Sequence, residues 1–195
     1  MSDNANDTLS SIAAASMQKC VEKLSRISAG VWSVVGADVS IGTLDAAIKR
    51  HGSDDGASVA VYFDVKGDLP FVAMILLDPR DIDRISRCFL GSAFSAPPVM
   101  NQPGELLLAE LGNIILNSFV GALSNTLNRT FMPSAPRCLK GEPQYLLEAM
   151  GAVMDLKQNY SIVSIELAIK CDKNVTRSEV LGLIPDKLAQ ELLPV

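Results

Sequence analysis

The predicted elements of this chain occur in the same order twice, and that repetition is the strongest constraint on its fold. Residues 58–65 alternate and are rich in Val and aromatic side chains, so they predict a strand. Gly67 is expected to supply the positive φ that a hairpin turn needs, and a second strand is expected at about 70–77. An Asp-Pro pair is then typical of a helix start, and the helix should run to about Leu90.

The C-terminal part of the chain repeats this order. "YSIVSIELAIKC" predicts a strand, "DKN" a turn, "VTRSEVLGLI" a second strand and "PDKLAQELL" a helix that starts on Pro185. Apolar residues at helical spacing predict a long helix before each hairpin, at about 11–35 and about 103–128. A short extended segment follows each long helix, near 38–43 and 136–141.

A unit of helix, strand, strand, strand and helix is therefore expected twice, at about 10–92 and about 100–195, within one domain spanning 1–195. Antiparallel hairpins with peripheral helices imply an α+β fold, in which both halves share a mostly antiparallel sheet and two long helices pack on it. The Pro-rich segment 92–104 is predicted to be a docked connector between the halves. Residues 142–156 are predicted to be a helical or irregular insertion.

Composition and charge exclude several classes of protein. Of the 195 residues 48% are hydrophobic, which is ample for a packed core. The opening residues are polar and lack a basic segment before an apolar stretch, and no apolar run reaches the roughly 18 residues that span a bilayer. The net charge of −5 comes from interspersed charges, without the basic stripe that nucleic acid requires. A cytoplasmic protein that binds neither membrane nor nucleic acid is expected.

Metal sites, disulfides and nucleophilic catalysis find little support in the sequence. The four cysteines, Cys20, Cys88, Cys138 and Cys171, are far apart in apolar contexts and form no C-x-x-C pair, so buried reduced thiols are predicted. His51, the one histidine, lies in the polar stretch "KRHGSDDG" and is expected to be solvated. No glycine-rich phosphate loop is present.

The second long helix carries an unusual row of polar residues. At about 100° per residue, one narrow sector, the polar stripe, contains Leu106, Glu110, Asn113, Asn117, Gly121 and Ser124. Leu and Ile fill most of the remaining surface. The stripe could be the solvated side of an amphipathic helix. However, solvated faces usually carry Lys, Arg and several Glu, whereas this stripe contains two Asn, which are poor helix formers. From the residues alone, a solvated face and a functional face are equally good interpretations.

This helix resembles the signature of the CheC/CheX/FliY phosphatases of bacterial chemotaxis. In that family a helix carries Glu-x-x-Asn, and a Pro follows the Asn at a characteristic distance. Glu110, Asn113 and Pro136 match this pattern, and the similarity extends over most of the chain, including the duplication. The chain departs from the family at Leu106, where Asp or Ser is frequent. In the first half, Ser11 and Ala14 fall at the positions of Glu110 and Asn113, so one site is expected rather than two.

The resemblance implies hydrolysis of the aspartyl phosphate of a CheY-like response regulator, which would supply its own Mg²⁺ and a Lys. Asn113 would place the attacking water, and Glu110 would pair with the regulator's Lys. Asn117, Leu106 and Ser124 would contact the partner from the same face. No intrinsic cofactor or metal is expected. A CheD-like deamidase or a second copy of the chain is a further candidate partner, and a non-catalytic flagellar-switch or docking module is the alternative function.

Overall fold

The computed structural model describes residues 3–52, 56–91, 102–152, 154 and 159–192. Most of the predicted connector 92–104 and of the loop after His51 lies outside these residues. The elements, in chain order, are α1 (Asp3–Ile27), β1 (Trp32–Thr43), α2 (Leu44–His51), β2 (Ser58–Lys66), β3 (Phe71–Leu77), α3 (Pro79–Leu90), α4 (Gln102–Leu127), β4 (Met132–Pro133), β5 (Arg137–Gly141), α5 (Pro143–Ala152), β6 (Tyr160–Cys171), β7 (Asn174–Pro185) and α6 (Asp186–Leu192).

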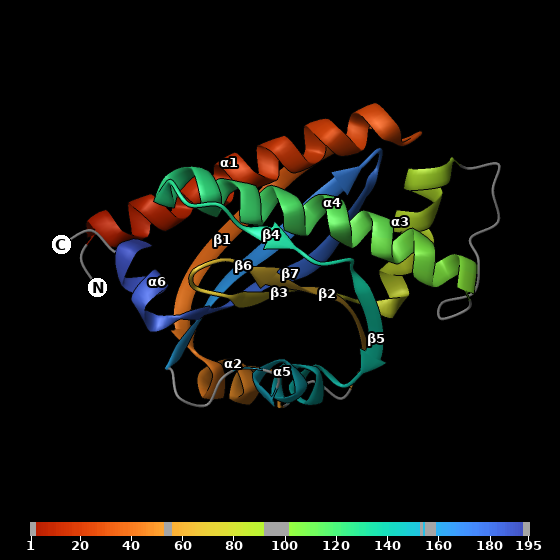
Figure 1. Ribbon diagram of the computed structural model, residues 1–195. Helices are drawn as coiled ribbons and strands as arrows, with labels where there is room; N and C mark the ends of the chain where they lie inside the picture. Colours follow the sequence, from red (N-terminus) through yellow and green to blue (C-terminus); the bar gives the residue numbers. More distant parts are fainter. Residues whose placement is uncertain (1–2, 53–55, 92–101, 153, 155–158, 193–195) are drawn as a thin grey trace.

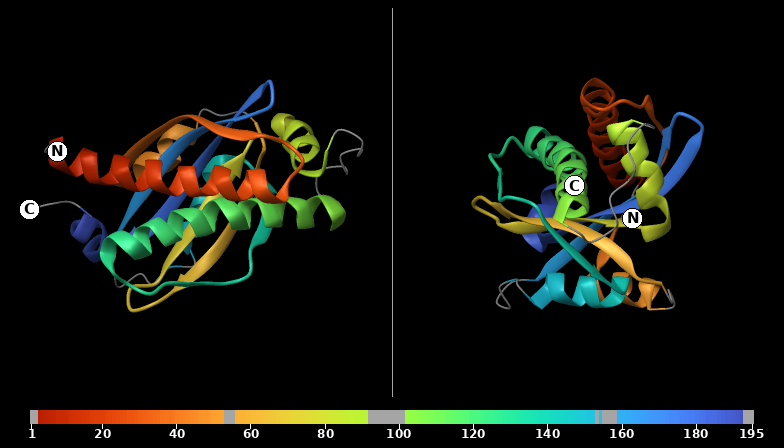
Figure 2. Two further views of the ribbon diagram at one scale, coloured as in Figure 1. Left: turned by 90° about the horizontal axis from the view of Figure 1, so that it is seen from above. Right: turned by 90° about the vertical axis from the view of Figure 1, so that its right-hand side faces the viewer.

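The strands form one antiparallel sheet in the order β1-β6-β7-β3-β2, and both β4 and β5 pair with β2 at the far edge. Helices α1 and α4 lie side by side and run in opposite directions across one face of this sheet, as the view from above shows (Figure 2). Helices α2 and α5 cover the other face, and α3 and α6 lie at opposite ends (Figure 1). The expected α+β class, antiparallel sheet and pair of long helices are confirmed.

The central strands are buried on both faces because helices cover both. All seven residues of β3 are buried. Alternate side chains enter different cores: Phe71 and Ile75 pack under α1 and α4, whereas Met74 and Leu76 pack under α2 and α5. Since successive side chains of a strand point to opposite faces, a continuous apolar sequence such as "FVAMILL" is what such a strand requires.

The order of strands reads equivalently from either end of the sheet. From one edge the order β1, β6, β7 matches β5, β2, β3 from the other, as expected if the second half repeats the first. Each half also contains a helix after its first strand, α2 or α5. The predicted unit lacked α2, and the helical alternative for 142–156 agrees with α5. Superposition of the halves about a twofold axis stays a prediction.

The first long helix ends earlier than predicted. It begins at Asp3 rather than near residue 11 and stops at Ile27 rather than near Val35, so β1 begins at Trp32 rather than near residue 38. The N–H groups of Ala29 and Gly30 donate to the carbonyls of Phe89 and Cys88, so a neighbouring segment, rather than a further helical turn, satisfies them. Trp32 is buried, and its Nε1 donates to the Ser28 hydroxyl at 2.6 Å.

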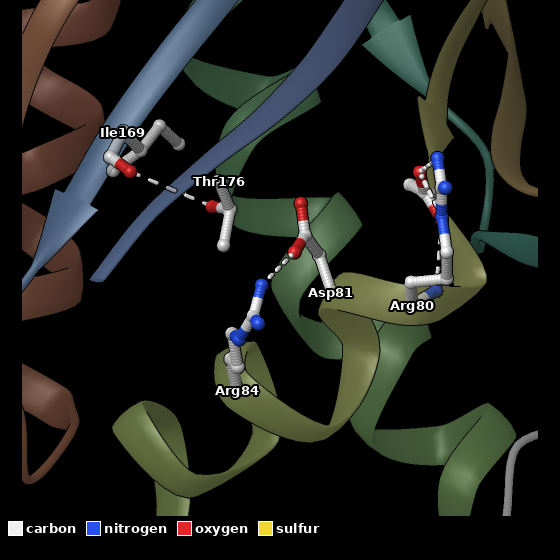
Figure 3. Close-up of polar contacts among 6 residues, drawn as sticks. Arg80, Asp81, Arg84, Ile169 and Thr176 are labelled. Carbon is white, nitrogen blue, oxygen red and sulfur yellow. Dashed lines mark hydrogen bonds and ion pairs between the residues drawn. The ribbon is translucent and has the colours of Figure 1, made fainter.

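Helix α3 starts as its sequence predicts. The Asp78 carboxylate accepts from the backbone N–H of Arg80, and Pro79 occupies the first helical turn. Arg84 then bonds Asp81 at 2.9 Å on the side of α3 that faces the β6–β7 hairpin (Figure 3). Gly91 ends the helix with a φ of 99°, a conformation that L side chains rarely adopt.

The expectation of four reduced thiols is wrong for two of them. Cys88, near the end of α3, and Cys171, the last residue of β6, form a disulfide. They lie 83 residues apart, and only the tertiary fold brings them together, so their spacing gave no indication of the pair. Cys20 and Cys138 are free, and burial raises the pKa of these thiols to about 12 and about 11.

The expectation that His51 is solvated is also wrong. Thr43 accepts a hydrogen bond from the N–H of Ala46 and so starts α2, which sequence patterns did not predict. This short helix places His51 over the sheet, where its Nε2 lies 2.7 Å from a carboxylate oxygen of Glu179 on β7. Arg50 and Ser164 also bond this carboxylate. The histidine therefore belongs to a partly buried polar cluster, in which Glu179 and Ser164 are buried and Arg50 is exposed.

We expect this cluster to make stability depend on pH. Burial raises the pKa of the Glu179 carboxyl, but hydrogen bonds from His51 and Ser164 and the charge of Arg50 outweigh it and hold the pKa below its usual value. A depressed carboxyl pKa contributes stability above its unfolded-state value, and this contribution is lost as pH falls through the folded-state value. Glu179→Gln should therefore cost roughly 1–3 kcal/mol at neutral pH and flatten the acid side of the profile. Urea unfolding of both proteins over a range of pH measures the loss of stability and its pH dependence. If the variant loses stability at acid pH as steeply as the wild-type protein does, Glu179 is not the group responsible.

A glycine sets how closely α4 approaches the sheet. A Cβ at Gly112 would lie 2.5 Å from Cγ1 of Val61 on β2, whereas a Cβ at Gly121 of the same helix meets nothing within 4 Å. Gly112→Ala should lower the free energy of unfolding by about 1–3 kcal/mol through overpacking. Gly121→Ala is the matched control and should raise it by about 0.5–1 kcal/mol. Chemical denaturation measures both; equal effects would show that α4 is not seated so tightly.

Candidate functional site

Helix α4 is largely a core helix with one open face. By length and composition Pro103–Leu127 could cross a membrane, but 61% of its most apolar window is buried inside the structure, which is typical of the core helix of a soluble protein. Leu111, Ile114 and Ile115 are buried, together with Phe119 and Leu123. The polar stripe runs along the side of α4 away from these residues.

Glu110 and Asn113 both lie on this open face. Glu110 is exposed and forms no ion pair within the described part of the chain, so its carboxylate is available to a cation on a partner. Asn113, three residues later, is half-buried at the helix surface rather than enclosed in the core. Residues three apart are neighbours on a helix, so the two side chains can face the same bound group.

The two carboxamides of the stripe are joined to each other. The Nδ2 group of Asn117 donates to Oδ1 of Asn113 at 2.7 Å. Both side chains are half-buried. The helical spacing predicts that both lie on one face. Their separation by four residues could also have indicated this bond, which was not predicted.

The other predicted site residues occupy different parts of the structure. Leu106, one turn before Glu110, is 67% exposed and extends the stripe with an apolar side chain. Ser124 lies at the far end of α4, where its hydroxyl donates to the carbonyl of Arg129. Pro136 immediately precedes β5, which pairs with β2 and contacts α4. The structure thus groups Leu106, Glu110, Asn113 and Asn117, with Ser124 about 16 Å from Asn113 along the helix.

In α1, Ser11 and Ala14 occupy the positions that correspond to Glu110 and Asn113. Ser11 and Ala14 are both exposed. Ser11 lines a groove of about 450 Å³ between α1 and α4, with Ile12, Ala15, Lys19, Ala122, Asn125 and Thr126. Neither residue offers a carboxylate or a carboxamide, which fits a first half that has lost its copy of the pair.

Only one group of three possible metal ligands lies close together among the described residues: Cys88, Cys171 and Asp172. The two sulfurs are bonded to each other, so they are not thiolate ligands. The group is also distinct from the stripe, to which none of the three belongs.

Comparison with solved structures finds the same architecture in bacterial chemotaxis and flagellar-switch proteins. FliY of Thermotoga maritima matches with a TM-score of 0.71 and 16% identity, over 98% of this chain and 95% of that one. The chain has the FliY, CheX and FliM fold. The FliM middle domain of Vibrio alginolyticus (TM-score 0.62, 16% identity, 95% and 99% covered) and CheX of Desulfovibrio desulfuricans (0.53, 13%, 89% and 99%) share it.

The resemblance inferred from Glu110, Asn113 and Pro136 is thereby confirmed at the level of the fold. No family model matches the sequence, and no curated protein is similar to it in sequence. The fold is shared by CheX and by the middle domain of FliM, so it fits either an enzyme or a switch module. The residues on α4 must decide between them.

Proposed function

We propose that this chain is a cytoplasmic phosphatase that hydrolyses the aspartyl phosphate of a CheY-like response regulator. The observation that carries the proposal is the pair of Glu110 and Asn113 on the open face of α4, in a fold shared with CheX. An acyl phosphate is already labile, so catalysis needs mainly a water held in line with the phosphorus and stabilisation of the phosphoryl charge.

Asn113 supplies the group that places the water. A carboxamide has an oxygen with two lone pairs and two N–H donors. In the proposed complex Oδ1 accepts a hydrogen bond from the water, and Nδ2 donates to the phosphoryl group. Glu110 is the single carboxylate of the stripe, and Mg²⁺ prefers several oxygen ligands. The ion in this mechanism therefore arrives with the regulator.

Glu110 anchors the docked regulator through its Lys. We expect Glu110→Gln to raise the KM for phosphorylated regulator as well as lower the rate, because it removes a charge-assisted contact of roughly 1.5–3 kcal/mol. The loss should shrink at high salt, where the wild-type contact is screened. Steady-state kinetics at two ionic strengths measures both effects. A change confined to the rate at saturating regulator would contradict an anchoring role.

The proposal is tested by the decay of a phosphorylated CheY-like regulator with and without the protein. We expect catalytic amounts of the chain to accelerate release of inorganic phosphate. The acceleration should require Mg²⁺ bound to the regulator and should persist when the chain itself has been treated with chelator. If the phosphorylated regulator binds the protein but still loses its phosphate at its intrinsic rate, the proposed phosphatase activity is wrong.

A non-catalytic switch module is the second candidate. The match to the FliM middle domain favours it, as does the exposed Leu106 beside Glu110, where an apolar side chain suits a docking surface. In that case the stripe binds a partner, and a CheD-like protein or a second copy of the chain becomes a candidate beside the regulator. Binding of the regulator that is independent of its phosphorylation, without phosphate release, distinguishes this function.

A further inference from the structure

The hydrogen bond between Asn117 and Asn113 points to a second functional carboxamide. The terminal torsion of an asparagine side chain is broad and roughly two-fold, so an unrestrained amide presents either its oxygen or its nitrogen to the same place. The donation from Asn117 Nδ2 to Asn113 Oδ1, at 2.7 Å, selects one of these orientations. We propose that Asn117 is a positioning residue that fixes the carboxamide of Asn113, and this inference rests on the proposed phosphatase function.

The hydrogen bond to Asn117 leaves Asn113 with the donors and the acceptor that the reaction needs. Oδ1 of Asn113 accepts from Asn117 with one lone pair and keeps the other for a water. Nδ2 of Asn113 is directed away from Asn117 and keeps both N–H donors for the phosphoryl oxygens. If the amide were inverted, its N–H group would face the water. The water needs an acceptor at that position, so it could not donate its hydrogen bond there. Since small errors in placement cost catalysis heavily, the orientation of this amide has a direct effect on rate.

Helix stability does not explain Asn117. Alanine is a much better helix former, so the carboxamide weakens α4 unless it has another use. The next residue of the stripe, Gly121, has no side chain, and a Cβ there would meet nothing within 4 Å. Within the stripe, the side chain that Asn117 contacts is therefore that of Asn113.

Three substitutions at Asn117 separate positioning from partner contact. Asn117→Ala frees the amide and should lower kcat about tenfold with little change in KM, because the docking surface is nearly intact. Asn117→Asp is isosteric but accepts only, so it should draw Nδ2 of Asn113 towards itself, invert the amide and lower kcat at least as much. Asn117→Gln keeps a donor on a longer arm and should recover part of the rate lost in Asn117→Ala.

Two controls complete the experiment. Asn125→Asp places the same extra charge at an exposed position of α4 outside the stripe and should leave kcat unchanged. In an Asn113→Ala background, Asn117→Ala should have no further effect on kcat, because no amide remains to be positioned. Raised KM with unchanged kcat, or equal losses in both backgrounds, overturns the inference in favour of a direct contact with the regulator. Absence of any wild-type acceleration instead overturns the proposed function.

Discussion

Asn113→Ala is expected to lower the rate of regulator dephosphorylation roughly a hundredfold at saturating phosphorylated regulator. Removing one positioned polar contact from a transition state typically costs about 3 kcal/mol. The substitution removes the group that places the water, while Leu106 and Glu110 keep the docking surface. The loss should therefore fall on kcat, with KM nearly unchanged. Phosphate release under saturating conditions, followed over a range of regulator concentrations, measures the two parameters separately.

The matched control is Asn125→Ala, because Asn125 is an exposed asparagine of the same helix that lies outside the stripe. It should retain the wild-type rate. The fold should survive both changes, since substitutions at the surface usually alter stability by about 0.5 kcal/mol or less. If Asn113→Ala dephosphorylates the regulator as fast as Asn125→Ala does, the catalytic function fails and the switch module takes its place.

The parts of the fold that the sequence predicted well are those specified locally. The β2–β3 and β6–β7 hairpins, the Asp78 cap and α4 each have their periodicity or capping residues within a short stretch. The stripe on α4 was predictable for the same reason. Helix periodicity alone placed Glu110 and Asn113 on one face and Leu111 and Ile115 on the other. The positive φ expected at Gly67 is wrong, since Gly91 is the one glycine with a positive φ among the described residues.

The failures share a dependence on distant residues. His51 looked solvated because its neighbours in sequence are polar, whereas its environment is set by Glu179 and Ser164 on the central strands. Helix α1 was extended too far because Val31 continues the helical spacing, although hydrogen bonds to Cys88 and Phe89 redirect the chain. Helix α2 is short, and packing over the sheet rather than propensity stabilises such a helix.

The disulfide between Cys88 and Cys171 is expected to contribute about 2–4 kcal/mol to the free energy of unfolding. The reason is the length of the chain it closes: the cysteines are 83 residues apart, so the bond removes much of the freedom of the unfolded chain. The double variant Cys88→Ser with Cys171→Ser should show this loss in denaturant unfolding. Reduction of the wild-type protein should produce a loss of similar size.

A reductant distinguishes the stability contributed by the disulfide bond from the stability contributed by the packing of the two sulfur atoms. It should destabilise the wild-type protein but leave the double variant unchanged, because Cys20 and Cys138 are already free thiols. Thiols are normally kept reduced in the cytoplasm, so the proposed cytoplasmic location makes the stability of the reduced protein the relevant one. Gly30→Ala supplies an independent check, since its Cβ would lie 2.6 Å from the Cys171 sulfur and should make the disulfide easier to reduce. If the wild-type protein, unfolded without reductant, already presents four reactive thiols, the bond does not form.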